Sequence, residues 1–142
     1  MKIAIGSDHG GYTLKLEIIK HLQDRGFEVK DYGCDSTASC DYPLFAKAVA
    51  EAVAAKKEEL GILICGTGIG MSMVANKVEG IRAALCSDCF SAQATKEHNN
   101  ANVLCLGART IGPGLALMIV DKFLDTPFSN DERHVRRINM FS

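Results

Sequence analysis

The feature of this chain that most constrains its fold is the regular alternation of short apolar, β-branched runs with stretches of helical periodicity. We expect strands at residues 2–6, 27–31, 61–65, 81–86 and 102–107, and helices at 12–25, 43–57, 68–77, 90–99, 113–124 and 131–140. This alternation predicts an α/β protein with a five-stranded parallel, Rossmann-like sheet and helices on both faces, in three α/β/α layers. Ligands bind at the carboxyl ends of the strands in such folds, so the loops there are expected to carry the chemistry.

Length and composition predict a single domain over residues 1–142 of a cytoplasmic protein. The formal net charge of −1 argues against a nucleic-acid or membrane-surface partner, because such partners usually require a basic patch. No apolar run approaches the roughly 20 residues of a membrane span, and no signal peptide is expected. Six cysteines in such a chain are expected to be free thiols in a reducing compartment.

The most informative segment joins the third expected strand to the helix that follows it. The strand ends on Cys65, and glycines at positions 66, 68 and 70 open the turn into the helix. We therefore expect the Cys65 thiol to lie beside unpaired backbone N–H groups, which bind anions. The same environment lowers the pKa of a cysteine from about 8.5 toward neutrality. A base beside an anion-binding loop is what removal of a proton next to a carbonyl requires.

Two other interpretations of this segment compete with a catalytic one. The glycines resemble a dinucleotide-binding fingerprint only weakly, because that motif follows the first strand and needs a glycine where Met71 stands, so NAD binding is rejected. A cysteine at a strand end is more often a small hydrophobe. Glycines that only fit a tight turn leave Cys65 and Thr67 unexplained, however, so the position favours a functional role.

Polar residues follow two other expected strands. Asp8 and His9 form an acid/base pair after the first strand, although Asp8 could simply cap the next helix. His98, after the fourth strand and its helix, could act as a general acid near neutral pH. It could equally contact the carbonyls at the end of its own helix, and the spacing does not choose between the two.

Arginines gather near the end of the chain. Arg133 and Arg137 are four residues apart and share one face of a helix. With Arg109 and Arg136 they could bind a phosphate through bidentate hydrogen bonds, although such a run is usually a solvated face. The C-x-x-C pair Cys86 and Cys89 lacks a second pair at zinc-ribbon spacing, so buried or half-buried thiols are favoured over a redox or metal role.

Taken together, these segments resemble the type B ribose-5-phosphate isomerases, a family that also includes the galactose-6-phosphate isomerase subunits. The resemblance runs through essentially the whole chain. It lies in residues 6–11, 41–43, 65–70, 75–77, 80–83, 98–99, 102–103 and 107–109, with the closing pair 133 and 137. It implies interconversion of D-ribose 5-phosphate and D-ribulose 5-phosphate by ring opening and enediolate proton transfer, with no metal or other cofactor.

The resemblance also implies a role for each residue of the cysteine loop. Cys65 would be the base that takes the C2 proton and returns it to C1. Backbone N–H groups around Gly66, Gly68 and Gly70, with Thr67, would hold the enediolate oxygens as negative charge develops on them.

Residues outside that loop receive roles from the same resemblance. Asp8 and His98 would open the furanose ring by moving a proton between the ring oxygen and the C1 hydroxyl. Asn99 and Tyr42 would orient the sugar hydroxyls. Four residues would bind the phosphate and so fix the reacting carbons beside the base: His9, Arg109, Arg133 and Arg137.

The resemblance also has implications for the identity of the catalytic base and for the oligomeric state. One branch carries a glutamate base at the position of Met71, and because methionine cannot take a proton, the task is expected to fall to Cys65 here. Sites in this family combine residues of two subunits, which implies an obligate homodimer or a dimer of dimers. A metal-dependent hydride shift is not expected, because the sequence offers no compact cluster of His, Asp and Glu ligands.

Other functions stay open. The chain could be a hexose-phosphate isomerase, acting on allose 6-phosphate or serving as a galactose-6-phosphate subunit with a dissimilar partner. The room left for a sixth carbon around Tyr42, Thr67 and Met71 would distinguish a hexose-phosphate isomerase from a pentose-phosphate isomerase. Unphosphorylated aldoses could be slow substrates. A redox or metal-binding module and a phosphosugar-binding protein without catalysis rank below these.

Overall fold

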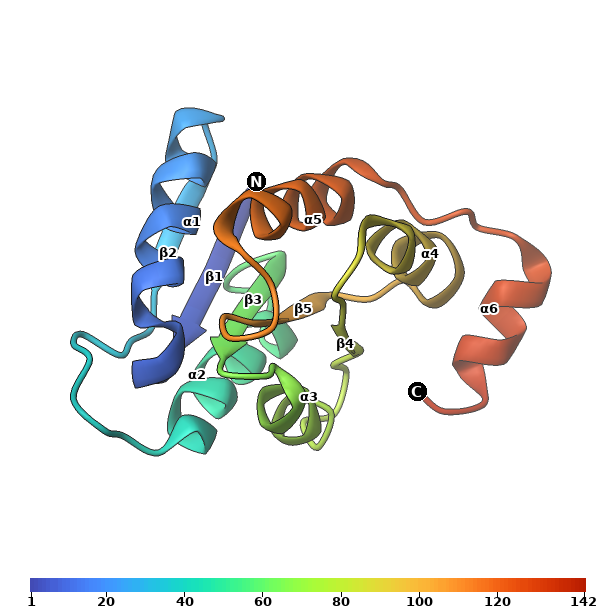
Figure 1. Ribbon diagram of the computed structural model, residues 1–142. Coiled ribbons are helices and arrows are strands. Elements are labelled where there is room, and N and C mark those ends of the chain that lie inside the picture. Colours follow the sequence, from blue (N-terminus) through green and yellow to red (C-terminus); the bar gives the residue numbers. More distant parts are fainter.

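The computed structural model describes residues 1–142, and Figure 1 shows a parallel sheet between two layers of helices. The strands are β1 (Lys2–Ser7), β2 (Glu28–Asp31), β3 (Leu60–Cys65), β4 (Ala83–Leu85) and β5 (Val103–Gly107). The helices are α1 (Tyr12–Asp24), α2 (Tyr42–Ala54), α3 (Ile69–Ala75), α4 (Cys89–Asn99), α5 (Pro113–Asp125) and α6 (Glu132–Asn139), with a short 3-10 turn, η1 (His9–Gly11). The expected fold is confirmed, and element ends differ by three residues at most.

The strands run in the order β2-β1-β3-β5-β4, with every neighbouring pair parallel. The chain leaves β1 for β2 on one side and later returns to β3 on the other side, so β1 and β3 flank a switch point of the sheet. In open α/β sheets, ligands bind outside the carboxyl ends of the strands at such a point. The loops after β1 and β3 are therefore placed where a site is expected.

Alternation along the central strands divides the core between the two helix layers. In β3, Ile62 and Ile64 belong to a core cluster with residues of α1 and α5, whereas Leu63 and Cys65 belong to a cluster with residues of α2 and α3. Successive side chains of a strand point to opposite faces, which explains this division. The Cys65 side chain thus lies on the α2–α3 side of the sheet.

The edge strand β4 is shorter than the sequence pattern suggests. Residues 81–86 were expected to form it, but side-chain amides take over its hydrogen bonds at one end. Asn102 Oδ1 accepts the Arg82 N–H at 2.8 Å, and Asn76 Oδ1 accepts the Ala83 N–H at 2.8 Å. Ladder pairing therefore begins only at Ala83, which faces Val103 of β5.

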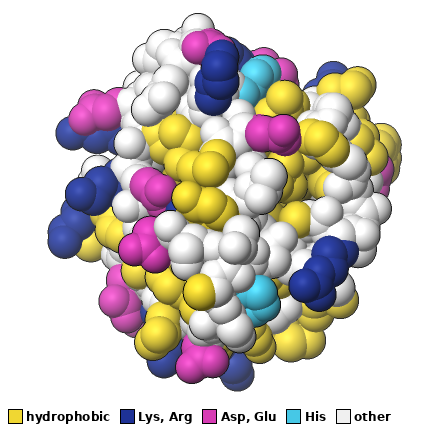
Figure 2. Space-filling view, turned by 60° about the vertical axis from the view of Figure 1, so that its left-hand side comes forward, with side chains coloured by type: hydrophobic (Ala, Val, Ile, Leu, Met, Phe, Trp, Pro, Cys, Tyr) yellow, Lys and Arg dark blue, Asp and Glu magenta, His cyan; other side chains and the backbone are white.

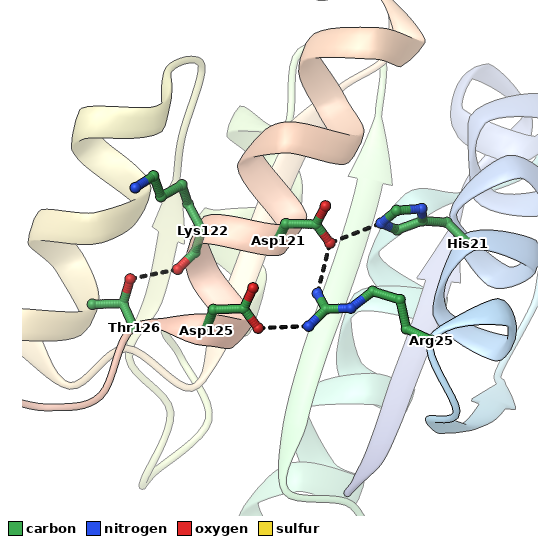
Figure 3. Close-up of polar contacts among 6 residues, drawn as sticks. All are labelled: His21, Arg25, Asp121, Lys122, Asp125 and Thr126. Atoms are coloured by element: carbon green, nitrogen blue, oxygen red, sulfur yellow. Dashed lines mark hydrogen bonds and ion pairs between the residues drawn. The ribbon is translucent and has the colours of Figure 1, made fainter.

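Helices α1 and α5 are joined by a charged cluster on the outside of one layer (Figure 3). Asp121 Oδ1 lies 2.7 Å from both His21 Nε2 and Arg25 Nη1, and Arg25 Nη2 donates to Asp125 Oδ1 at 2.6 Å. This cluster links the end of α1 to the second half of α5.

The molecular surface is mixed in charge. Figure 2 shows acidic and basic side chains interspersed on one face rather than gathered into a basic patch. Every helix of the structure is too short or too polar to cross a lipid bilayer.

Candidate active site

The loops that follow β1 and β3 are in direct contact. The backbone N–H of Asp8 donates to the Ile64 carbonyl at 3.2 Å. Gly11 lies so close to β3 that a β-carbon on it would come within 2.6 Å of the Ile64 oxygen. Only glycine permits this approach, so Gly11 allows the loop that carries Asp8 to lie against the end of β3, where Cys65 stands.

Cys65 ends β3, and its thiol faces the following turn. It is 7% exposed, and its sulfur accepts a hydrogen bond from the Gly68 N–H at 3.1 Å. The expected placement of the thiol beside the backbone donors of the turn is therefore observed. Reactive cysteines act through the thiolate, which is both the nucleophilic and the basic form.

Further backbone donors of this turn have no acceptor within the protein. The N–H groups of Gly66, Thr67 and Gly70 make no hydrogen bond to protein atoms. The Thr67 side chain is exposed, and its oxygen already accepts the Ile69 N–H at 3.2 Å, which leaves the hydroxyl proton free to donate outward. The loop can therefore offer several donors to a negatively charged oxygen.

Asp8 and Arg109 both lie close to this turn. Asp8 accepts the N–H groups of Gly10 and Gly11 at 2.9 and 3.1 Å, both on Oδ1. It thus caps η1, the short turn before α1, while Oδ2 makes no protein hydrogen bond. A β-carbon on Gly66 would lie 3.4 Å from Arg109 Cδ, and one on Gly10 would lie 3.7 Å from Arg109 Nη2. The exposed guanidinium of Arg109 therefore lies across both glycine loops.

His9 is held by a residue that the sequence did not single out. The Cys40 N–H donates to His9 Nδ1 at 3.3 Å. Since Nδ1 accepts a hydrogen bond, the ring proton of neutral His9 lies on Nε2 in this arrangement. No sequence pattern signals this contact, because the donor is a backbone group in a loop.

Tyr42 covers the start of α3. A β-carbon on Gly70 would lie 2.5 Å from Tyr42 Cε1 and 2.9 Å from its hydroxyl, so the phenol ring rests directly on the glycine. Met71, the next residue, is fully buried in the core on this side of the sheet. Position 71 therefore supplies no acidic side chain to the site.

The remaining expected site residues form a second group. The rings of His98, at the end of α4, and His134, on α6, lie 4.7 Å apart. Arg133 Nε and Nη2 each lie 3.2 Å from an oxygen of Asp131, whose carboxylate has its pKa lowered to about 2 by those hydrogen bonds. His98 contacts α6 rather than the carbonyls at the end of its own helix. The group consists of His98, Asn99, Arg133 and Arg137, all exposed.

The two groups lie at opposite ends of the sheet. Cys65 pairs with Gly107 at the carboxyl end of β5, whereas Asn99 precedes Val103, the residue that begins this strand. The four steps from Val103 to Gly107 span about 13 Å of strand. Figure 1 accordingly shows α6 beyond α4, away from the loop between β3 and α3. One chain therefore does not bring all expected site residues together.

The cavities of a single chain agree with this division. One, of about 510 Å³, lies between α4 and α5, and another, of about 410 Å³, lies beside β4 and α4. Neither is lined by Cys65, so the cysteine turn lies outside both cavities.

The C-x-x-C pair does not form a disulfide here. All six cysteines are free thiols, and Cys86 is 2% exposed. Burial raises the pKa of the Cys86 thiol to about 11, so little thiolate is present near neutral pH. No three His, Cys, Asp or Glu side chains of the chain are grouped so as to hold a metal ion.

Comparison with known proteins identifies relatives over the whole chain. A model of the Ribose/Galactose Isomerase family matches residues 3–141. Ribose-5-phosphate isomerase B of Escherichia coli (strain K12) is 50% identical over 137 residues, which cover 96% of this chain and 91% of that protein.

Solved structures give the same result. Clostridium thermocellum ribose-5-phosphate isomerase B is 52% identical, with a TM-score of 0.97 over 99% of this chain and 94% of that one. Ribose-5-phosphate isomerase B from Mycoplasma genitalium, whose crystal structure holds bound ribulose-5-phosphate, is 46% identical, with a TM-score of 0.94 over 98% and 92%.

Proposed function

This chain belongs to the ribose/galactose isomerase family, and we propose that its cysteine turn is the place where a sugar phosphate is isomerised. The protein is an aldose–ketose isomerase that interconverts ribose 5-phosphate and ribulose 5-phosphate. The observation that carries the assignment of the site is the Cys65 sulfur, which lies beside backbone donors that have no acceptor in the protein.

Cys65 acts as the base in the proposed mechanism. Its thiolate takes the proton from C2 of the open-chain aldose, and the electron pair of that bond forms the C1–C2 double bond of an enediolate. The proton returns to C1 as the carbonyl forms at C2, so the reaction is balanced without an oxidant or reductant. Met71 is buried and cannot accept a proton, which leaves the transfer to Cys65.

The enediolate oxygens are stabilised by the turn itself. The free N–H groups of Gly66, Thr67 and Gly70 are available as donors, with the Thr67 hydroxyl beside them. A single preorganised donor of this kind contributes about 3 kcal/mol to transition-state stabilisation. Because these donors can neutralise the developing charge, we propose that the reaction is metal-independent.

Ring opening and phosphate binding use both groups of residues. Asp8 keeps Oδ2 free to exchange a proton with the sugar, and His98 would be its acid/base partner. His9 with Nε2–H outward and Arg109 would bind the phosphate together with Arg133 and Arg137. Tyr42 and Asn99 would contact the sugar hydroxyls.

A second copy of the chain is required for these roles to be filled in one site. His98, Asn99, Arg133 and Arg137 lie at the far end of the sheet from Cys65, so they can complete only the turn of another copy. Large exposed apolar side chains lie on α3, at the end of β4 and at the start of α4: Ile69 is 46%, Met73 66%, Leu85 40% and Phe90 79% exposed. We propose that this surface is buried in a homodimer whose sites each use both chains.

We also propose a cytoplasmic location. Six free cysteines are compatible with a reducing compartment, whereas oxidising compartments favour disulfides. Fractionation of cells that produce the protein at native level tests this, since recovery outside the cytoplasm would contradict it.

Assay of the purified chain tests the function. We expect interconversion of ribose 5-phosphate and ribulose 5-phosphate by this chain alone, with allose 6-phosphate and galactose 6-phosphate used less efficiently. Preference for a hexose phosphate would assign the chain to the other branch of the family. Binding of ribose 5-phosphate without turnover would identify a sugar-phosphate-binding protein and contradict the proposal.

A further inference from the structure

Lys15, on the first turn of α1, is the only charged side chain of the protein that is 0% exposed. A lysine is almost never fully buried unless its charge is paired. It lies within the apolar stripe of α1, between Leu14 and Ile18, where nothing in the sequence marks it as functional. Its surroundings therefore need an explanation.

The Lys15 ammonium has two hydrogen-bond acceptors and one aromatic neighbour. Nζ donates to Asp31 Oδ1 at 2.9 Å and to the Cys34 carbonyl oxygen, and it lies 5.3 Å from the centroid of the Tyr12 ring. The first two partners lie at the end of β2 and in the loop that follows. Because the ammonium is enclosed, these contacts are shielded from water and fix the loop to α1.

The loop fixed in this way carries the donor that holds His9. Residues 31–34 continue beside β1: Ser7 N–H donates to the Gly33 carbonyl at 2.7 Å, and Cys34 N–H donates to the Ser7 carbonyl at 2.9 Å. From this anchor the loop runs outward over exposed residues to Cys40, whose N–H meets His9 Nδ1 at 3.3 Å. Lys15 thus holds the beginning of the loop, at Asp31 and Cys34, and the end of the same loop, at Cys40, contacts His9.

We propose that Lys15 is a positioning residue for phosphate binding, because it anchors the 31–40 loop so that the Cys40 amide orients the His9 ring. It touches neither substrate nor reacting atoms. The proposal rests on the proposed function in one respect, namely that His9 binds the phosphate. Loss of the anchor should weaken phosphate binding and leave the proton transfer at Cys65 intact.

The test compares Lys15→Met with Lys20→Met, which removes an exposed lysine of the same helix that pairs only with Asp24. For both variants, KM and kcat for ribose 5-phosphate and the inhibition constant of inorganic phosphate are measured. For Lys15→Met we expect KM and the phosphate inhibition constant to rise about fivefold, with kcat within about twofold of wild type. Lys20→Met should match wild type.

A double-mutant cycle separates positioning from general stability. In a His9→Ala background, Lys15→Met should leave the phosphate inhibition constant unchanged, because the group it positions is gone. A variant Lys15→Met that melts earlier but keeps wild-type KM and phosphate inhibition would overturn the proposal. So would an effect of equal size with and without His9.

Two further measurements keep the test decisive. Should Lys15→Met fail to fold, Asp31→Asn weakens the same anchor at a half-exposed position, and unchanged phosphate inhibition in that variant overturns the proposal. Should wild type not isomerise ribose 5-phosphate, the proposed function fails by itself. Calorimetric binding of inorganic phosphate to the same variants then decides the role of Lys15.

Discussion

The backbone N–H of Gly68 donates a 3.1 Å hydrogen bond to the sulfur of Cys65, and the two residues define the cysteine turn. Gly68 has a φ of 78°, in the left-handed region that favours glycine. A β-carbon there would lie 2.5 Å from Leu85 Cδ1 and 2.9 Å from the Leu106 carbonyl carbon. The donor to the sulfur therefore depends on the absence of a side chain at position 68.

Gly68→Ala is expected to disable the enzyme. The new methyl group would strain the backbone and push the turn away from β5, which should cost about 2 kcal/mol of unfolding free energy. It should also displace the donor from the Cys65 sulfur, so kcat should fall by more than about tenfold. Chemical denaturation and steady-state kinetics measure the two effects.

Gly66→Ala is the matched control for that prediction. A β-carbon at position 66 makes its nearest contact with Arg109 Cδ at 3.4 Å, which is ordinary van der Waals distance. Its unfolding free energy should stay within about 0.5 kcal/mol of wild type. Equal losses of stability in Gly68→Ala and Gly66→Ala would contradict the prediction that position 68 has the stricter requirement for glycine.

The central part of the fold could be predicted from sequence because its signals are local. The buried runs of β1, β3 and β5 and the glycines beside Cys65 depend on residues close together in the chain. The order of β4 and β5 could not be predicted, since it depends on packing between elements. The length of β4 was overestimated because the amides of Asn76 and Asn102 replace ladder hydrogen bonds.

The candidate site could be predicted only in part. Asp8 and Arg109 follow strands and Cys65 ends one, so the topology brings them together at the carboxyl edge. The separation of His98 and Arg133 from that edge follows from the direction of α4 and from where α6 packs. The support of His9 by Cys40, and the burial of Lys15, involve backbone and tertiary contacts that leave no pattern in a sequence.

Mixing two inactive variants tests the shared site. In the proposed dimer, Cys65→Ala and His98→Asn damage the two halves of each site, so both homodimers should be nearly inactive. After unfolding and refolding together, half of the dimers should be hybrids with one intact site, which predicts about a quarter of wild-type activity. No recovery beyond the sum of the separate variants would indicate that each site is built from one chain.

The raised pKa of the buried Cys86 thiol should make the stability of the protein depend on pH. Its pKa is raised from 9.0 to about 11 by burial, so above about pH 9 the unfolded chain releases this proton before the folded chain does. The unfolding free energy should therefore fall between about pH 9 and about pH 11, and less steeply in Cys86→Ala. Denaturation curves at both pH values measure the difference; identical slopes for the two proteins would contradict the raised pKa.

The charged cluster between α1 and α5 should affect stability without affecting catalysis. Arg25 contacts Asp121 and Asp125, but all three side chains are partly exposed, so Arg25→Gln should lower the unfolding free energy by about 1 kcal/mol or less. The cluster shares no residue with the cysteine turn, and kcat/KM should stay at the wild-type value. A tenfold fall in kcat/KM would show coupling to the site that the structure does not explain.

The most direct test of the account is the rate at which ribose 5-phosphate is isomerised in excess chelator by wild type, Cys65→Ala and Cys89→Ala. Cys89 is a half-buried thiol outside the turn and serves as the matched control. We expect wild type and Cys89→Ala to be fully active and Cys65→Ala to lose at least about a hundredfold in kcat while remaining folded. A fully active Cys65→Ala, or a wild type silenced by the chelator, would contradict a metal-independent isomerase with Cys65 as its base.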